Sequence, residues 1–171
     1  MSYFQHFPTI LYDANGDGSA KLATNILKRV RMRANMKKEV VMLDQYDIRE
    51  NETPEIVSDK HHGTPTYHWV VLLLNNVSDV NHDWVKSTRQ MQRYLLSKYS
   101  ENQLNAAHHY EITQTSGDVT TKIEVENSSY PLATTVTNYE YEIALNETKR
   151  KIDLLRNDYL HVFVEEFKNL I

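Results

Sequence analysis

The sequence predicts a mixed α+β fold, because it carries both helical and strand patterns. Thr53 and Pro54 form a typical helix start, in which threonine caps the helix and proline occupies its first turn. Residues 106–127 alternate between apolar and polar side chains, which is typical of strands. Residues 138–171 contain neither glycine nor proline and repeat apolar side chains at helical spacing. Together these patterns indicate a protein that contains both helices and strands.

Composition narrows the class of protein further. The 171 residues carry a net charge of −4 and contain no cysteine, which excludes disulfides, thiol catalysis and thiolate zinc sites. The length fits one domain, or one small module with long appendages. The longest apolar run, Trp69 to Leu74, is far shorter than the roughly 20 residues of a membrane-spanning helix. The N-terminus shows no secretory signal, and the overall charge does not favour nucleic acid. We therefore expect neither a membrane nor a nucleic acid as a partner.

The N-terminal segment, residues 1–43, is expected to be aromatic and then helical. Tyr3, Phe4 and Phe7 precede the turn-forming stretch from Asp13 to Gly18. A helix is then expected from Ser19 to about Ala34, because Leu22, Ile26, Leu27 and Val30 recur at helical spacing.

A compact core is expected over residues 44–86. A strand over residues 46–49 leads into a helix that starts behind Thr53 and stops at Gly63. The apolar run over residues 69–74 fits either a helix or a buried strand, and the cap signal at Thr64 favours the helix.

Two further segments complete the chain. Residues 87–137 are expected to hold a helix to about Ser100 and a β-hairpin that turns at Ser116 and Gly117. Residues 138–171 are expected to form a C-terminal helix, about 50 Å long if it is continuous. Such a helix outruns a compact domain of this size, so part of it is expected to pack on another protein, with packing on the chain's own core as the alternative.

One stretch resembles a calcium-binding loop. Asp13, Asn15, Asp17 and Gly18 match the first half of such a loop, which supplies oxygen ligands and a sharp turn. The twelfth position, where a bidentate glutamate belongs, is Thr24. We therefore favour an ordinary polar turn over a calcium site, and expect no metal.

The basic and histidine-rich stretches favour surfaces rather than sites. Seven basic and no acidic side chains lie between Lys21 and Lys38, without the interleaved aromatic residues that stack on bases. A solvated face, or a surface that meets an acidic partner, is the favoured interpretation. The pairs His61–His62 and His108–His109 lack the spacing of three or four that suits chelation on a helix.

No motif of an enzyme appears in the sequence. It lacks the Gly-x-Ser-x-Gly nucleophile elbow, the Gly-x-x-x-x-Gly-Lys phosphate loop and the Gly-x-Gly-x-x-Gly dinucleotide loop. No pair of carboxylates stands out as an acid and base couple. We therefore predict a protein that is not an enzyme and uses no cofactor.

Residues 44–86 resemble a LysM module, a small β-α-α-β fold known for binding peptidoglycan and chitin. The resemblance lies in Tyr46-Asp-Ile-Arg49, Glu52-Thr-Pro-Glu-Ile-Val57, Lys60-His-His-Gly63 and Leu72-Leu-Leu-Asn-Asn-Val77. Residues 80–84 stand where the family has its closing strand. The resemblance implies a LysM-like core to which the N-terminal helix, the hairpin and the C-terminal helix attach as arms. It also implies an alternative function, binding of a glycan.

A wider part of the chain resembles the small baseplate wedge subunit of contractile-tailed phages of the T4 type. The resemblance rests on Pro54-Glu55, Tyr67-x-Trp69, Asn75-Asn76 with Asp79 and Trp84, Asn138-Tyr-Glu-Tyr-Glu142, and Asn146-Glu-x-Lys149-Arg150. It implies a structural protein of the virion, assembled in the host cytoplasm, that joins neighbouring wedges into a sixfold ring. The implied partners are the larger wedge proteins and the neighbouring wedges.

Eleven tyrosines in a chain without a catalytic motif favour a protein whose task is contact. Trp69 and Trp84 fit either the core or an interface, since tryptophan is highly buried on average. The candidate interface residues are aromatic, apart from one histidine: Tyr3, Phe4, Phe7, Tyr67, His68, Trp84, Tyr139, Tyr141, Tyr159, Phe163 and Phe167.

Overall fold

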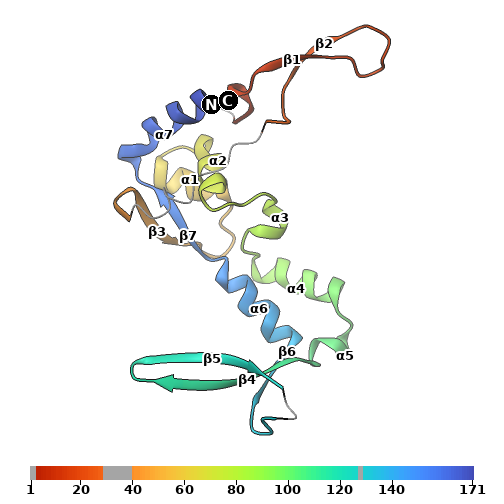
Figure 1. Ribbon diagram of the computed structural model, residues 1–171, viewed down its shortest axis with the longest axis vertical. Helices are drawn as coiled ribbons and strands as arrows, with labels where there is room; N and C mark the ends of the chain where they lie inside the picture. Colours follow the sequence, from red (N-terminus) through yellow and green to blue (C-terminus); the bar gives the residue numbers. More distant parts are fainter. Residues whose placement is uncertain (1–2, 29–39, 127–128) are drawn as a thin grey trace. The chain divides into compact units, whose positions relative to one another are not determined.

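The computed structural model describes residues 3–28, 40–126 and 129–171 and divides into two compact units (Figure 1). Unit 1 comprises Met1–Trp84 and Lys151–Ile171, and unit 2 comprises Val85–Arg150. Both contain helices and strands, so the predicted α+β class is confirmed. None of the helices in the described part of the chain is long and apolar enough to cross a membrane.

Unit 1 is built on two antiparallel strands, β3 (Leu43–Asp47) and β7 (Lys151–Leu155), with Leu43 opposite Leu155. A short 3₁₀ turn, η3 (Val40–Met42), leads into β3. The chain between the strands forms α1 (Pro54–His62), the 3₁₀ turn η4 (Pro65–Tyr67), α2 (His68–Leu74) and α3 (Val80–Asp83) before entering unit 2. The strand that pairs with β3 therefore comes from the C-terminal part of the chain, and residues 80–83 are helical.

Local signals set the ends of α1 where the sequence predicts them. The Thr53 side chain accepts a hydrogen bond from the Ile56 N–H, and Pro54 lies in the first turn. The helix ends at Gly63, whose φ of 73° is left-handed and favours glycine. The run over residues 69–74 is helical, as the cap signal at Thr64 favours.

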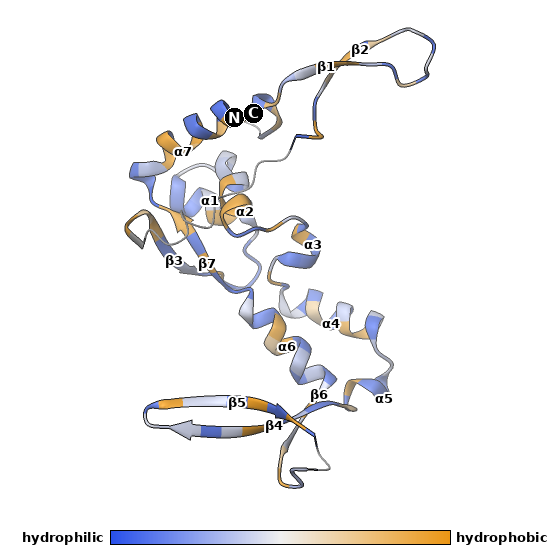
Figure 2. Cartoon of the chain, in the orientation of Figure 1, coloured by the Kyte–Doolittle hydropathy of each residue, from blue (hydrophilic) through white to orange (hydrophobic). Residues whose placement is uncertain are grey.

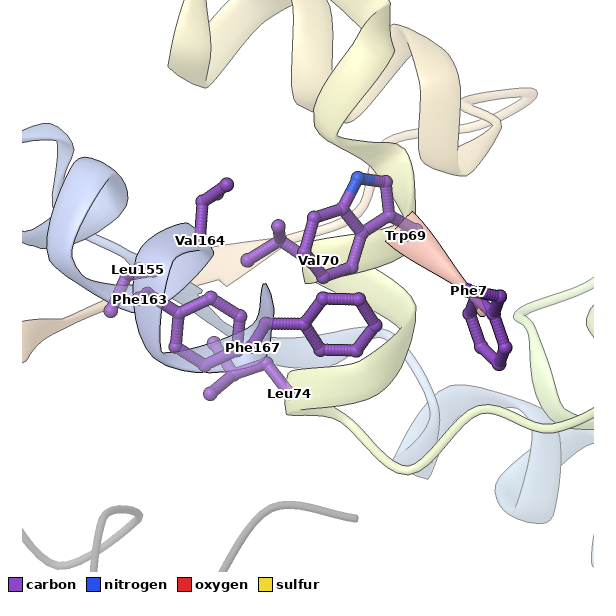
Figure 3. Packing of buried hydrophobic residues seen from close by; sticks show 8 residues of the cluster. All are labelled: Phe7, Trp69, Val70, Leu74, Leu155, Phe163, Val164 and Phe167. Atoms are coloured by element: carbon purple, nitrogen blue, oxygen red, sulfur yellow. The ribbon is translucent and has the colours of Figure 1, made fainter. Parts of the chain in front are cut away.

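The core of unit 1 forms where α2 meets α7 (Asn157–Leu170) and the N-terminal segment (Figure 3). Trp69 lies at its centre, with ring centroids 4.6 Å from Phe167 and 6.2 Å from Phe163. The buried cluster consists of Phe7, Trp69, Val70, Leu74, Leu155, Phe163, Val164 and Phe167. The apolar face of α7 thus packs on the chain's own core, where Phe163 and Phe167 are buried, and a contact of these two residues with another protein stays a prediction.

Asn75 fastens the end of α2 to β7. Its Nδ2 donates to the carbonyls of Val71 and Asp153 at 2.9 and 2.8 Å, and its Oδ1 accepts from the Asp153 N–H at 3.0 Å. The half-buried Asn75 amide therefore uses both of its N–H donors and one of the two lone pairs of its oxygen.

Asn75→Ala is expected to lower the free energy of unfolding by about 2 kcal/mol, because the Asp153 backbone groups lose both partners. Asn75→Asp keeps an oxygen that can accept from the Asp153 N–H and removes the Nδ2 donor, so it should lower the free energy of unfolding by a different amount from Asn75→Ala. Urea unfolding measures both, and a change below about 0.5 kcal/mol for alanine would contradict this role of the amide.

The expected N-terminal helix is wrong over its described part. After the 3₁₀ turn η1 (Tyr3–His6), β1 (Thr9–Tyr12) and β2 (Lys21–Thr24) form an antiparallel ribbon in which Leu11 faces Leu22. The turn between them contains Gly16 and Gly18, whose φ values of 70° and 81° allow the chain to reverse. Strand pairing therefore outweighs the helical spacing of Leu22 and Ile26, and residues 29–34 of the expected helix lie outside the described residues.

A continuous C-terminal helix over residues 138–171 is also wrong. The chain forms α6 (Asn138–Thr148), then β7, then α7. The break occurs because β7 pairs with β3 and buries Ile152, Leu154 and Leu155. Pairing and burial of these side chains outweigh their local compatibility with a helix.

In its described residues, 85–126 and 129–150, unit 2 combines three helices with a three-stranded antiparallel sheet. Its helices are α4 (Thr88–Lys98), α5 (Glu101–Leu104) and α6. The sheet has the strand order β5 (Val119–Val125), β4 (Ala107–Ser116) and β6 (Thr134–Thr137). The helix and hairpin predicted for residues 87–127 are present. Asn146 of α6 accepts from the Lys86 N–H at 2.8 Å and donates to its carbonyl at 3.0 Å, which fastens α6 to the segment before α4.

Candidate partner-binding surfaces

The structure divides the candidate interface residues by burial. Phe7, Trp84, Phe163 and Phe167 are buried within unit 1 and are not available for direct contact in this conformation. Phe7, Phe163 and Phe167 are buried because the N-terminal segment and α7 fold onto α2, which the sequence pattern alone does not indicate. The others are half-buried or exposed, so a role of these residues in partner contact stays a prediction: Tyr3, Phe4, Tyr67, His68, Tyr139, Tyr141 and Tyr159.

Tyr3 and Phe4 belong to an aromatic cluster that ties the N-terminal segment to unit 1. The Tyr3 ring lies 5.6 Å from Trp69 and 5.4 Å from Phe167, and Phe4 lies 5.1 Å from Tyr3. Offset and edge contacts at these distances stabilise aromatic pairs. The cluster therefore holds the root of the β1–β2 ribbon, while Phe4 stays exposed.

Tyr141 of α6 has its partner inside unit 2. Its ring stacks on His108 with centroids 3.8 Å apart and an interplanar angle of 10°. The His108 Nδ1 lies 2.9 Å from the Nδ1 of His109, at an irregularity in the pairing of β4 with β6. This irregularity lets two consecutive side chains of one strand approach each other.

Trp84 has a structural role. Its Nε1 donates to the carbonyl of Glu52 at 2.8 Å. The buried Glu52 carboxylate accepts from the Tyr46 hydroxyl at 2.8 Å, from the Arg49 N–H at 2.8 Å and from the Lys60 ammonium at 2.5 Å. Burial raises the pKa of Glu52, but these donors outweigh it and hold the pKa below its usual value. An ionised, fully engaged carboxylate of this kind stabilises the fold.

Two exposed apolar surfaces were not recognised from the sequence. The first is the β1–β2 ribbon, in which Leu11 and Leu22 are 73% and 70% exposed although they face each other across the strands. Ile26 and Leu27, just beyond β2, are exposed as well. The sequence feature that indicates this ribbon is an apolar pair, Leu11 and Leu22, on either side of a glycine turn. It was not recognised because a helix was expected from Ser19 onward.

The second surface is the β4–β5 hairpin of unit 2. Tyr110, Ile112, Ile123 and Val125 share one face, because Tyr110 pairs with Val125 and Ile112 with Ile123. No residue of the three strands of this sheet is buried. The cartoon in Figure 2, coloured by hydropathy, shows hydrophobic positions recurring along β5. Tyr110, Ile112 and Val125 are half-buried, whereas Ile123 and Val119 are exposed. Partly exposed apolar faces are typical of surfaces that contact other proteins.

The calcium-like loop is a turn that its own aspartate holds. The Asp13 carboxylate accepts from the N–H groups of Asn15, Gly16 and Gly18 at 3.1, 2.8 and 2.7 Å. These donors, chiefly Gly18, hold the pKa of Asp13 below its usual value. Both carboxylate oxygens thus accept hydrogen bonds from the backbone of the turn.

Residues 3–28, 40–126 and 129–171 contain no cluster of three or more His, Asp or Glu side chains that suits a metal ion. Of the basic stretch, Lys21 and Lys28 are described and exposed. Its other members, Arg29, Arg31, Arg33, Lys37 and Lys38, lie outside the described residues.

His61 and His62, at the end of α1, fasten this helix to the start of α7. The His61 Nε2 lies 2.9 Å from the Leu155 carbonyl and 4.0 Å from the Asp44 carboxylate. Asn157 donates to the His61 carbonyl at 2.9 Å, and its Oδ1 lies 2.7 Å from the His62 Nδ1. This arrangement requires the His62 Nδ1 to carry the proton, which leaves the buried Nε2 without a partner.

Mild acid is therefore expected to weaken unit 1. Burial, together with the neighbouring His61, lowers the pKa of His62 against the opposing effect of Asn157. A histidine whose pKa is lowered in the folded state has no effect on stability above its ordinary pKa of about 6.5, where it is neutral in both states. Below that pH the unfolded chain binds the proton more readily, so the free energy of unfolding decreases as the pH falls. Urea unfolding at pH 7.5 and 5.5 should show this loss, and His62→Gln should reduce the difference. An equal pH dependence in both proteins would contradict the assignment to His62.

Each of the two units has a ribbon that leaves apolar side chains exposed, an arrangement typical of proteins that work by contact with other proteins. The model of the family described as base plate wedge protein 53 matches residues 2–132. The chain belongs to this family of phage baseplate wedge proteins, which places it in the phage tail. No curated protein matches the chain. The family match gives no support to glycan binding as the alternative function.

Proposed function

We propose that the chain joins neighbouring wedges of the phage baseplate during assembly. The observation that carries the proposal is that each compact unit has an exposed apolar β-ribbon of its own, β1–β2 in unit 1 and β4–β5 in unit 2. A protein with two separate contact surfaces is suited to bridge two partners. In a ring, many such contacts reinforce one another, so each one can be weak by itself.

The partners in this proposal are the larger wedge proteins and the neighbouring wedge, with six copies of the chain in the sixfold ring. Assembly takes place in the host cytoplasm before the tail is complete. The exposed aromatic residues Phe4 and Tyr139, one in each unit, are proposed to contribute to the contacts. Aromatic side chains bury a large area at little cost in conformational entropy, which suits them to interfaces.

Reconstitution of rings from purified wedges tests the proposal. Wedges should close into rings when the chain is present and stay separate without it. The double variant Leu11→Asp/Leu22→Asp should retain binding to one wedge but fail to close rings, because it charges the exposed ribbon of unit 1 alone. Lys21→Ala, in the same strand, is the matched control and should assemble normally. Ring closure without the chain, or by the double variant, would overturn the proposal.

A further inference from the structure

The β5 strand forms an open edge of the sheet in unit 2. The strand order β5-β4-β6 places β4 in the middle, so within the described residues β5 is paired on one side, by β4. An unpaired strand edge presents a row of free N–H and C=O groups, which another strand can satisfy. A hairpin that is two-stranded over most of its length is only marginally stable in water, so it gains from such an addition.

The turn of the hairpin determines which groups point outward. Gly117 and Asp118 form a two-residue connection, and the φ of 60° at Gly117 suits the first position of a type II′ turn. Ser116 and Val119 on either side then form a hydrogen-bonded pair, and the pairs alternate along the ladder. The N–H and C=O groups of Thr120, Lys122 and Glu124 therefore point away from β4.

The side chains on the polar face of this edge are short of positive charge. Glu124 lies directly opposite Glu111, and like charges in this position are destabilising. The ammonium of Lys122 pairs with Glu111. Because Lys122 pairs with Glu111, a cation supplied by an added strand beside Glu124 would give the second carboxylate a partner of opposite charge.

We propose that the β5 edge binds an extended segment of another baseplate protein, in which basic and apolar residues alternate. The basic residues of this segment lie beside Glu124 on the polar face, and its apolar residues extend the face that holds Ile123, which is 39% exposed. Main-chain hydrogen bonds to the outward groups supply affinity, and the alternation supplies selectivity. The inference rests on the proposed function in one respect, that the segment comes from the baseplate.

Binding of a designed peptide to the full chain tests this inference. The probe is a peptide of about eight residues in which valine and lysine alternate, and the control alternates valine and glutamate. The lysine peptide should bind about five-fold more tightly at low salt, and slow the hydrogen exchange of the amides of Thr120, Lys122 and Glu124. In Glu124→Lys the preference should reverse. Equal binding of the two peptides, or protection elsewhere in the chain, would overturn the inference.

A matched pair of proline variants separates this edge from the other edge of the hairpin. Thr120→Pro removes an outward N–H of β5, whereas Thr115→Pro removes the outward N–H of the opposite residue on β4. Thr120→Pro should abolish binding of the lysine peptide and Thr115→Pro should retain it. Equal binding by both variants would overturn the assignment to β5, as would sedimentation showing that this edge pairs two copies of the chain.

The outcome is distinguishable from a failure of the proposed function. If the wild-type chain closes rings but binds no peptide at β5, the inference falls and the proposed function stands. If it binds the peptide at β5 but closes no rings, the proposed function falls and the strand-binding edge remains.

Discussion

Replacing Trp69 with alanine is expected to lower the free energy of unfolding of unit 1 by about 3–5 kcal/mol. The side chain is 4% exposed and contacts Tyr3, Phe163 and Phe167, so the substitution leaves a cavity between α2, α7 and the N-terminal segment. The loss should also loosen the root of the β1–β2 ribbon, because Tyr3 packs on the same ring. Limited proteolysis near residues 8–28 should become faster.

Trp69→Phe is the matched control for this prediction. It retains an aromatic ring and removes an indole N–H that is buried without a partner, so its cost should be clearly smaller. Urea unfolding of both variants measures the two losses in the free energy of unfolding. A loss below about 1 kcal/mol for alanine would show that Trp69 is not the centre of the core.

Replacing Glu142 with alanine is expected to destabilise unit 2 by about 3 kcal/mol. The carboxylate is 3% exposed and accepts from the Lys98 ammonium at 2.5 Å and the Tyr99 hydroxyl at 2.9 Å. It thereby joins α6 to the end of α4, and the substitution leaves both donors without their acceptor. Glu147→Gln, in the same helix, breaks a more exposed ion pair with Arg150 and should cost less than about 1 kcal/mol.

The stability of unit 2 should also depend on pH through Glu142. Burial raises the pKa of this carboxyl, but the hydrogen bonds from Lys98 and Tyr99 outweigh burial and hold the pKa below its usual value. A carboxyl with a lowered folded pKa contributes stability above its unfolded pKa, and this contribution is lost as the pH falls through the folded pKa. Thermal unfolding between pH 7 and 3 should show a decline that is smaller in Glu142→Gln but still present, because other carboxyls with lowered pKa values, such as Glu52, remain. A decline of the same size in Glu142→Gln would contradict the role of Glu142.

The parts of the fold that depend on neighbours in sequence could be predicted. The ends of α1 follow from Thr53, Pro54 and Gly63, and the β4–β5 hairpin follows from alternation around Gly117. Both features are local, because capping and turn geometry involve residues a few positions apart.

The parts that depend on distant pairing could not be predicted. The apolar residues of β7 also fit a helix, and only their pairing with β3, far earlier in the sequence, makes them a strand. The same reason explains why Phe163 and Phe167 were expected at an interface, since their burial depends on Trp69 and the N-terminal segment. The exposed pair of Leu11 and Leu22 could not be predicted because two local signals conflicted there. The helical spacing from Leu22 onward indicated a helix, whereas the glycine turn before it favoured the strand pairing that the structure has.

Cryo-electron microscopy of the intact baseplate tests most directly whether this chain joins wedges. The map should place each copy in contact with two neighbouring wedges, with the β1–β2 ribbon of unit 1 and the β4–β5 hairpin of unit 2 both covered by other proteins. If every contact of a copy lies within one wedge, or if both ribbons are exposed to solvent in the assembled ring, the chain does not join wedges in the way proposed.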